Sequence, residues 1–345
     1  MRVAECVEIG PMDGLAIVEH PDPVAGPGMV VVRVEAAGVN YVDALFVQGR
    51  YQIKPPVPFV PGSEIAGAII AVGDGVDGTL VGRRVVSMCG LGGFAEQAVI
   101  PAVAAVPIPD ALDAPRAAVF IQSFCTARFA LDQRASLEAG ERVLVLGAGG
   151  GVGQATVAVA RAAGAHVAAV ASTPAKRAAA LAAGAAVAFD AAGRRSDAAG
   201  EIDDSAADQG DTSNDATALV HAVRDWSDGG VDIALDPVGG PLSIAALRAL
   251  GLFGRLLVIG FPAGIAELPA NQILLRNRAV LGVDWGAWSM KDPAGQRALL
   301  DDLLDDVAAG RLEPPAPETR PLEAVVGALE DLTERRVTGK LVLVP

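Results

Sequence analysis

The stretch VLVLGAGGGVGQ, Val143 to Gln154, is the most informative part of this 345-residue chain for predicting its fold. Apolar residues predict a strand, a run of glycines follows, and a helical pattern begins at Val152. Glycine lacks the Cβ that would block a ligand, and a helix N-terminus offers free N–H groups and the positive end of a dipole. A strand that ends in such a turn is typical of pyrophosphate binding, with a purely structural turn as the alternative. The expected cofactor contacts are Gly147, Gly150, Gly151, Val152 and Gly153.

The same region, Val143 to Ala160, holds eighteen uncharged residues, which approaches the length of a membrane-spanning helix. Five of the eighteen are glycines, and glycine weakens a helix. A strand, a turn and a helix explain the stretch better, so we expect no membrane span.

The residues after Glu141 alternate between strand and helix patterns. Strands are predicted at Val143–Leu146, His166–Ala171, Ala186–Phe189, Val231–Asp236 and Arg255–Ile259, with helices at Val152–Ala163, Ala175–Ala183, Ala216–Trp226 and Leu242–Leu250. This alternation predicts a doubly wound parallel sheet with helices on both faces. The first 110 residues instead carry short β-branched runs between Gly and Pro, which indicates a mostly β domain.

The segment Asp190 to Asp215 interrupts this alternation. It carries eight acidic and two basic residues, a net charge of −6, and lacks large apolar side chains apart from Ile202. We expect a solvated, flexible loop; a lid or a partner-docking segment is the alternative.

Composition excludes several classes of protein. The net charge of −14 and the pI near 4.6 disfavour a nucleic-acid partner, because binding of a phosphate backbone normally needs a basic surface. Cys6, Cys89 and Cys125 form no CxxC pair, so neither a disulfide framework nor a cysteine zinc cluster is expected. Glu5 and Glu8 interrupt the apolar run that a secretory signal needs, and we expect a cytoplasmic protein.

The choice of dinucleotide depends on the end of the second strand. NAD sites usually place an acidic residue there for the ribose 2′-hydroxyl, but no acidic residue occurs between Gln154 and Phe189. Hydroxyl-bearing and cationic residues occur there instead. We interpret them as a binding site for the 2′-phosphate of NADPH; the alternative is that the cations only solvate a helix surface. The residues that we expect around that phosphate are Ser172, Thr173, Lys176 and Arg177.

Several motifs together resemble the zinc-independent quinone oxidoreductases of the medium-chain dehydrogenase/reductase superfamily. They are AAGVNYVDALFVQGRYQIKPPVPFVPGSEIAG at 36–67, GGFAEQAVIP at 92–101, the glycine turn, DPVGG at 236–240, GRLLVIGF at 254–261 and the C-terminal GKLVLVP. The resemblance implies a Rossmann domain at 124–262 inserted in a GroES-like, partly open β-barrel catalytic domain, formed by 1–123 and 263–345. It also implies an active site in the cleft between the domains.

Two zinc-ligand positions of related dehydrogenases are replaced in this chain. The first loop reads GVN at 38–40 instead of carrying a cysteine, and the GHE segment reads GSE at 62–64. Catalytic zinc normally needs three protein ligands, so we expect no metal.

The resemblance also implies three catalytic residues, Asn40, Tyr51 and Thr126. Asn40 and Tyr51 would donate hydrogen bonds to a developing oxyanion, and Thr126 would orient the nicotinamide. The alternatives are a loop residue that bonds its own backbone, a loop anchor and a helix N-cap, respectively. Further cofactor contacts are expected at Gly260 and Phe261 beside the nicotinamide, and at Lys340 near the phosphates.

The expected activity is NADPH-dependent reduction of a quinone or another conjugated carbonyl, because such acceptors take hydride without a Lewis acid. A tyrosine six residues before Tyr51 in some relatives is Leu45 here, which predicts a less polar pocket. An enoyl-thioester or enone double-bond reductase and a non-catalytic NADPH-binding protein are the alternatives. The resemblance further implies a homodimer joined through edge strands, with Ala279–Asp284 as either the contributor or an ordinary internal strand.

Overall fold

The computed structural model describes residues 1–202 and 215–345 and divides into two compact units. The first unit comprises Met1–Gln122 and Pro315–Pro345, and the second comprises Ser123–Pro314. Each unit has a β-sheet of its own.

The second unit is built on six parallel strands. They are β8 (Arg142–Leu146), β9 (His166–Val170), β10 (Val187–Phe189), β11 (Val231–Asp236), β12 (Leu250–Val258) and β13 (Ala279–Gly282). Their order in the sheet is β10-β9-β8-β11-β12-β13, and every neighbouring pair is parallel. The order reverses between β8 and β11, which is the switch point where doubly wound sheets bind their ligands. The predicted doubly wound sheet is thereby confirmed.

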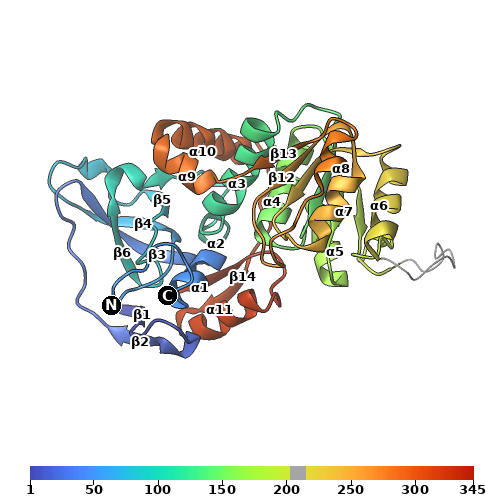
Figure 1. Cartoon of the computed structure of the whole chain (residues 1–345). Helices are drawn as coiled ribbons and strands as arrows, with labels where there is room; N and C mark the ends of the chain where they lie inside the picture. The colour runs from blue at the N-terminus through green and yellow to red at the C-terminus, as the bar shows by residue number, and fades with distance from the viewer. Residues whose placement is uncertain (203–214) are drawn as a thin grey trace. The chain divides into compact units, whose positions relative to one another are not determined.

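Helices cover both faces of this sheet (Figure 1). They are α4 (Gly151–Ala162), α5 (Pro174–Ala182), α6 (Asp215–Trp226) and α7 (Pro241–Ala249). Helix α4 packs beside α5, and α6 packs beside α7. The four residues Val143 to Leu146 of β8 are all fully buried, as expected of a strand that is covered on both faces.

Strand β12 is longer than its sequence pattern predicts. The prediction begins at Arg255, whereas the strand begins at Leu250 and is irregular in its pairing with β11. Phe253 adopts a positive φ of 59°, and both Leu252 and Phe253 are exposed. Exposed apolar residues in an irregular strand break the pattern on which the prediction depends.

The second unit extends beyond the boundary that we predict at Pro262. Strand β13 hydrogen-bonds to β12 in parallel register and completes the sheet. The helices α8 (Ala270–Leu274), α9 (Trp285–Lys291) and α10 (Pro293–Ala308) belong to the same unit. Arg128 and Asp306 form a salt bridge that ties α10 to the start of the unit. The segment 263–314 therefore belongs with the parallel sheet, because its strand and helices find their partners there.

The first unit carries a mainly antiparallel sheet. Its strands are β3 (Met29–Val39), β4 (Glu64–Val72), β5 (Arg84–Met88), β6 (Gln97–Pro101), β7 (Val106–Pro107), β14 (Glu318–Pro321) and β15 (Leu341–Val344). The order is β14-β15-β3-β4-β5-β7, with β6 paired to β3. Residues from both ends of the chain thus share one sheet.

Short elements close the core of the first unit. They are the hairpin β1 (Arg2–Cys6) and β2 (Leu15–Glu19) and the helices α1 (Tyr41–Val47), α2 (Ala114–Ala117) and α11 (Val325–Thr333), with 3-10 turns at 12–14, 78–80, 102–104 and 322–324. Phe94 and Ile65 are almost fully buried in this core, beside Leu329 of α11.

The described part of the acidic segment, 190–202, folds into hydrogen-bonded turns. Arg194 forms a salt bridge with Asp190, and the N–H of Ser196 donates to the carbonyl of Ala188. Residues 203–214, the remainder of the expected flexible loop up to Asp215, lie outside the described residues. Within residues 1–202 and 215–345, no helix is long and apolar enough to cross a membrane.

The glycine turn makes a prediction about stability. A Cβ on Gly153 would lie 2.3 Å from the carbonyl oxygen of Gly147, whereas a Cβ on Gly150 would meet no atom closer than 3.5 Å. We expect Gly153→Ala to lower the free energy of unfolding by about 1–3 kcal/mol, the usual cost of overpacking, and Gly150→Ala to cost less than about 1 kcal/mol. Denaturation in urea measures both; equal losses for the two variants would contradict the packing argument.

Candidate active site

The turns at the carboxyl edge of the parallel sheet pack against one another. Gly147 follows β8 with a φ of +58°, and a Cβ there would lie 2.8 Å from the side chain of Val238, which follows β11. A Cβ on Gly239 would lie 2.7 Å from the Cα of Phe261, which follows β12. Asp236 stabilises the turn after β11, because its side chain accepts hydrogen bonds from the N–H groups of residues 238 and 239, each at 2.8 Å. Three turns that are distant in sequence therefore form one surface.

The start of α4 is open on this surface. Gly150 is the N-cap, and the next three residues, Gly151, Val152 and Gly153, form the first helical turn. The first N–H groups of a helix have no acceptor inside the helix, so they are available to an anion. The predicted pyrophosphate contacts thus come together, and the open N-cap fits the close approach of a phosphate.

Lys176 reaches this turn from the next helix. A Cβ on Gly149 would lie 2.4 Å from the Cβ of Lys176, so the lysine stem lies directly against the glycine backbone. Thr173 is the N-cap of α5, and its hydroxyl accepts a hydrogen bond from the N–H of Lys176 at 3.3 Å. Ser172 and Thr173 are exposed. Of the four residues predicted around the 2′-phosphate, Lys176 therefore lies against the glycine turn and Thr173 is hydrogen-bonded to Lys176.

Arg177 lies elsewhere than we expect. Its side chain is buried, and its Nε donates to the carbonyl of Gly200 at 2.8 Å, while Nη1 donates to the carbonyl of Ala171 at 3.4 Å. A guanidinium that is committed to two backbone carbonyls holds a loop rather than facing a phosphate. The structure thus contradicts the predicted phosphate contact of Arg177.

Polar side chains gather around Asn40 in the first unit. We refer to Asn40 together with Asp43, Ser63, Glu64 and Lys340 as the Asn40 cluster. Asn40 is the N-cap of α1 and is 2 % exposed. Its Nδ2 donates to Ser63 Oγ at 3.4 Å and to Glu64 Oε2 at 3.3 Å, and its Oδ1 accepts from Lys340 Nζ. The amide nitrogen that we predict as an oxyanion donor is therefore already bonded to the protein.

Two carboxylates of the cluster are fully buried. Glu64 Oε1 accepts hydrogen bonds from the N–H of Ile121 at 2.5 Å and from that of Gln122 at 3.3 Å. Burial raises the pKa of Glu64 to about 7, although the nearby Lys340 charge opposes the shift. Burial likewise raises the pKa of Asp43 to about 6, against the hydrogen bond that its Oδ2 accepts from the N–H of Asn40 at 2.8 Å.

Lys340 comes to the cluster from the C-terminal end of the chain. It is partly buried, and burial lowers the pKa of its ammonium group while the charges of Glu64 and Asp43 raise it. We predict Lys340 as a contact of the cofactor phosphates; in the structure its ammonium donates to Asn40. The two residues are 300 positions apart, so no local sequence pattern predicts this contact.

Tyr51 and Thr126 keep side-chain oxygens without a hydrogen bond to any residue in the described ranges. The ring of Tyr51 packs on Phe46, with ring centroids 4.8 Å apart. Thr126 is 7 % exposed and lies inside a helical run, between the π-helical turns Ile121–Cys125 and Phe129–Arg134. Its alternative as a helix N-cap is therefore wrong. π-Helical turns often occur at functional sites.

The side chains at the former zinc positions do not fit a zinc ion. Asn40 offers an amide, Ser63 offers a hydroxyl, and Glu64 is already bonded to backbone N–H groups. Burial and the neighbouring Asp43 raise the pKa of the Cys89 thiol to about 12. Among the described residues, no three or more His, Cys, Asp or Glu side chains are grouped as metal ligands.

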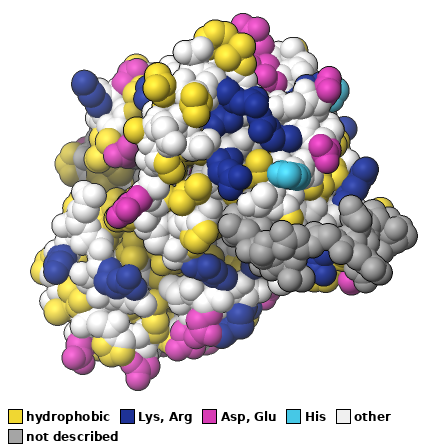
Figure 2. Space-filling view, turned by 45° about the vertical axis from the view of Figure 1, so that its right-hand side comes forward, with side chains coloured by type: hydrophobic (Ala, Val, Ile, Leu, Met, Phe, Trp, Pro, Cys, Tyr) yellow, Lys and Arg dark blue, Asp and Glu magenta, His cyan; other side chains and the backbone are white. Residues whose placement is uncertain are grey.

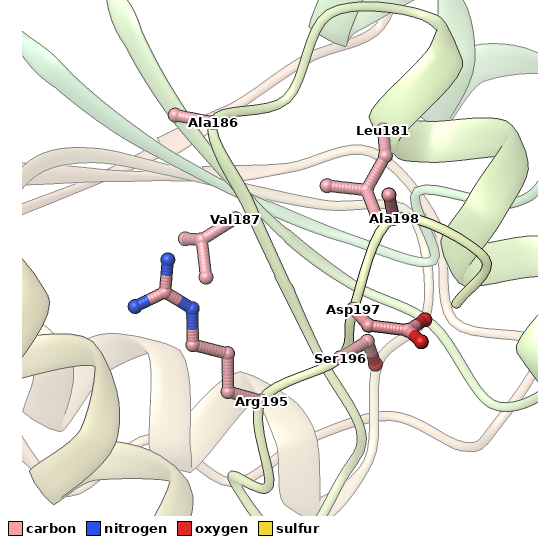
Figure 3. Close-up of a pocket in the computed structure, with 7 residues that line it drawn as sticks. All are labelled: Leu181, Ala186, Val187, Arg195, Ser196, Asp197 and Ala198. Carbon is pink, nitrogen blue, oxygen red and sulfur yellow. The ribbon is translucent and has the colours of Figure 1, made fainter. Parts of the chain in front are cut away.

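A hollow of about 430 Å³ lies away from this candidate site (Figure 3). Its lining residues are Leu181, Ala186, Val187, Arg195, Ser196, Asp197 and Ala198. Val187 begins β10, whereas the glycine turn follows the end of β8, and the two strands run in the same direction. The hollow therefore lies beside β10, the edge strand of the sheet, whereas the glycine turn follows β8, two strands away.

Basic side chains also gather where the sequence does not predict them. Figure 2 shows Lys and Arg side chains grouped on one face. Four arginines from separate segments, Arg224, Arg248, Arg276 and Arg278, lie close enough to affect one another electrostatically. Burial, with repulsion from Arg276 and Arg224, lowers the pKa of Arg278 to about 10. They are 54 residues apart at most, and no motif relates them.

Family models match both units. The alcohol dehydrogenase GroES-like domain matches residues 26–110, and the zinc-binding dehydrogenase domain matches residues 151–299. A GroES-like unit combined with a six-stranded dinucleotide-binding sheet defines the class as the medium-chain dehydrogenase/reductase superfamily of oxidoreductases.

Individual relatives narrow this class. The chain is 34 % identical to quinone oxidoreductase-like protein 2 of Bos taurus, over 99 % of the chain and 92 % of that protein. A crystal structure of a Thermus thermophilus quinone oxidoreductase, also solved with NADPH, is 33 % identical, with a TM-score of 0.80 over 100 % of both chains. A probable oxidoreductase of Mycobacterium abscessus, 33 % identical, reaches a TM-score of 0.83 over 100 % of this chain and 99 % of that one. The chain belongs to the quinone oxidoreductase family.

Proposed function

We propose that this protein is an NADPH-dependent reductase of quinones or related conjugated carbonyls. The observation that carries the cofactor choice is the Lys176 stem against Gly149, which brings a cation to the turn expected to hold the pyrophosphate. The exposed hydroxyls of Ser172 and Thr173 stand at the end of β9, where an NAD site would carry a carboxylate. A crystallised quinone oxidoreductase of the same family binds NADPH, which supports this choice.

The protein residues supply binding and orientation in this proposal. The α4 N-terminus holds the pyrophosphate, and Gly260 and Phe261 lie at the nicotinamide end, since they follow β12 at the same edge of the sheet. When bound, NADPH supplies the hydride. The hydroxyl of Tyr51 donates a hydrogen bond to the developing oxyanion, and that of Thr126 orients the nicotinamide. The amide nitrogen of Asn40 already donates to Glu64 and Ser63, and the amide oxygen accepts one hydrogen bond from Lys340. The group that Asn40 offers to a ligand is therefore the second lone pair of its oxygen, which acts as a hydrogen-bond acceptor.

A conjugated carbonyl fits a site without a metal. Alcohol oxidation needs a Lewis acid or a strong base to ionise the hydroxyl, whereas a quinone or enone already accepts hydride. The amide of Asn40 and the hydroxyl of Ser63 are poor zinc ligands, and we therefore propose that activity requires no zinc.

A double-bond reductase acting on enones or enoyl thioesters is the second candidate. Leu45 favours it, because an apolar side chain replaces the tyrosine that some relatives carry near the acceptor. A protein that binds NADPH without turnover is the third.

A panel of acceptors separates these candidates. Purified protein is given NADPH with benzoquinones, naphthoquinones, enones and enoyl thioesters, and NADPH consumption is followed at 340 nm. We expect turnover with quinones that persists, within about twofold, after dialysis against a zinc chelator. Turnover with enones or enoyl thioesters but not with quinones would establish the second candidate. No turnover with any acceptor, despite NADPH binding, would leave the third.

The cofactor choice has its own test. We expect Lys176→Ala to weaken NADPH binding by about 10- to 100-fold, the usual worth of a charge-assisted hydrogen bond, and to change NADH binding by less than about threefold. Fluorescence titration measures both dissociation constants. Lys291→Ala, in which an exposed lysine of α9 is removed, is the matched control. Equal losses for the two nucleotides would contradict the proposed 2′-phosphate contact.

We also propose that the protein is a homodimer. Strand β13 is an edge strand of the parallel sheet, and the apolar residues Leu252, Phe253, Leu274 and Leu275 of the same unit are exposed. An unpaired strand edge with exposed apolar neighbours favours pairing with a second copy. We expect twice the chain mass of 34.9 kDa in light scattering. Val280→Pro, which places a proline in the edge strand, should shift the mass toward the monomer.

A further inference from the structure

The hydrogen bonds of the Asn40 cluster have only one consistent direction. The ammonium group of Lys340 has three donors and no acceptor, so the Asn40 atom that faces it must be Oδ1. The amide nitrogen then faces Glu64 Oε2 and Ser63 Oγ. The two ends of an amide are otherwise hard to distinguish, and here the donor-only lysine decides between them.

Glu64 meets donors on both of its oxygens. Oε2 accepts from the Asn40 amide, and Oε1 accepts from the N–H groups of Ile121 and Gln122. A carboxylate is an acceptor on both sides, whereas an amide offers one acceptor and one donor. A glutamine at position 64 would therefore turn an N–H toward either the Asn40 nitrogen or the backbone N–H groups. No orientation of a glutamine satisfies every partner.

Charge compensation links the two ends of the cluster. Asp43 and Glu64 are fully buried, and the Lys340 ammonium acts electrostatically on both. A buried charge that loses its partner is strongly unfavourable, whereas removal of both partners costs much less. The effects of removing Glu64 and Lys340 should therefore not be additive.

We propose that Glu64 and Lys340 are positioning residues that orient the Asn40 amide from its two ends. Glu64 also accepts hydrogen bonds from the backbone at Ile121 and Gln122, the last two residues of the N-terminal segment of the first unit. The role replaces the phosphate contact that the sequence predicts for Lys340. The tests of this proposal that measure turnover rest on the proposed function. The directions of the hydrogen bonds do not depend on the substrate.

Two roles of Lys340, orientation of Asn40 and contact with a cofactor phosphate, can be separated by experiment. If Lys340 orients Asn40, Lys340→Met leaves the dissociation constant of NADPH within about threefold and lowers kcat by about tenfold or more, with a smaller change in KM. If Lys340 contacts a cofactor phosphate, the same variant weakens NADPH binding by about tenfold or more. Lys340→Arg, which retains a donor-only cation, should recover part of the lost kcat. Lys291→Met is the matched control.

Hydrogen exchange tests the Glu64 end without any need for turnover. We expect the amides of Ile121 and Gln122 to exchange at least about tenfold faster in Glu64→Gln than in the wild type, because a glutamine keeps one acceptor oxygen instead of two and a neutral oxygen accepts more weakly than a carboxylate. Glu313→Gln, at an exposed position, should leave both rates unchanged. Glu64→Asp retains two acceptor oxygens and should fall between the other variants, and it serves in place of Glu64→Gln if that variant does not fold.

The double variant Glu64→Gln/Lys340→Met completes the test. We expect its loss of kcat, and its loss of melting temperature, to be smaller than the combined losses of the single variants. Additive losses together with unchanged exchange at Ile121 and Gln122 would overturn the proposal, as would weakened NADPH binding in Lys340→Met. A wild type that binds NADPH but turns over no acceptor would contradict the proposed function alone, since exchange, nucleotide affinity and melting temperature still decide on the positioning pair.

Discussion

A Cβ on Gly153 would lie 2.3 Å from the carbonyl oxygen of Gly147, and a Cβ on Gly149 would lie 2.4 Å from the Cβ of Lys176. This crowding is the constraint on which the second unit depends. The first contact lets α4 begin directly at the end of β8, and the second lets α5 bring its lysine to the same turn. Larger residues at either position would push the helix N-terminus away from the switch point of the sheet.

The first unit depends on a different constraint, the direction of hydrogen bonds in a buried polar cluster. The chain of hydrogen bonds begins at the Lys340 ammonium, which can only donate, and continues through the Asn40 amide. It then reaches the Glu64 carboxylate, which accepts, and ends at the backbone N–H of Ile121. Each buried group needs a partner of the opposite kind, so the order of the groups allows one arrangement. Where zinc-dependent relatives carry metal ligands, this chain thus carries Asn40 and Ser63, and the Lys340 ammonium donates a hydrogen bond to Asn40.

Most of the parallel sheet could be predicted from the sequence, and the reason is local. Strands β8 and β11 are apolar runs bounded by turn residues, and their helices begin and end close to the predicted positions. The exposed first half of β12 and the segment 263–314 could not be predicted in the same way. Exposed apolar residues give no periodic pattern, and the edge strand β13 joins its unit through a partner strand that sequence proximity does not specify.

The fold class, the glycine turn and the absence of an acidic residue after the second strand follow from residue type at neighbouring positions, so they can be read from the sequence alone. The different surroundings of Lys176 and Arg177 depend on the tertiary structure. Neighbouring residues on a helix point about 100° apart, so one reaches the glycine turn while the other is buried against Gly200. Only the tertiary structure, likewise, brought Lys340 to Asn40, because a hydrogen bond across 300 residues depends on two strands that pair in one sheet.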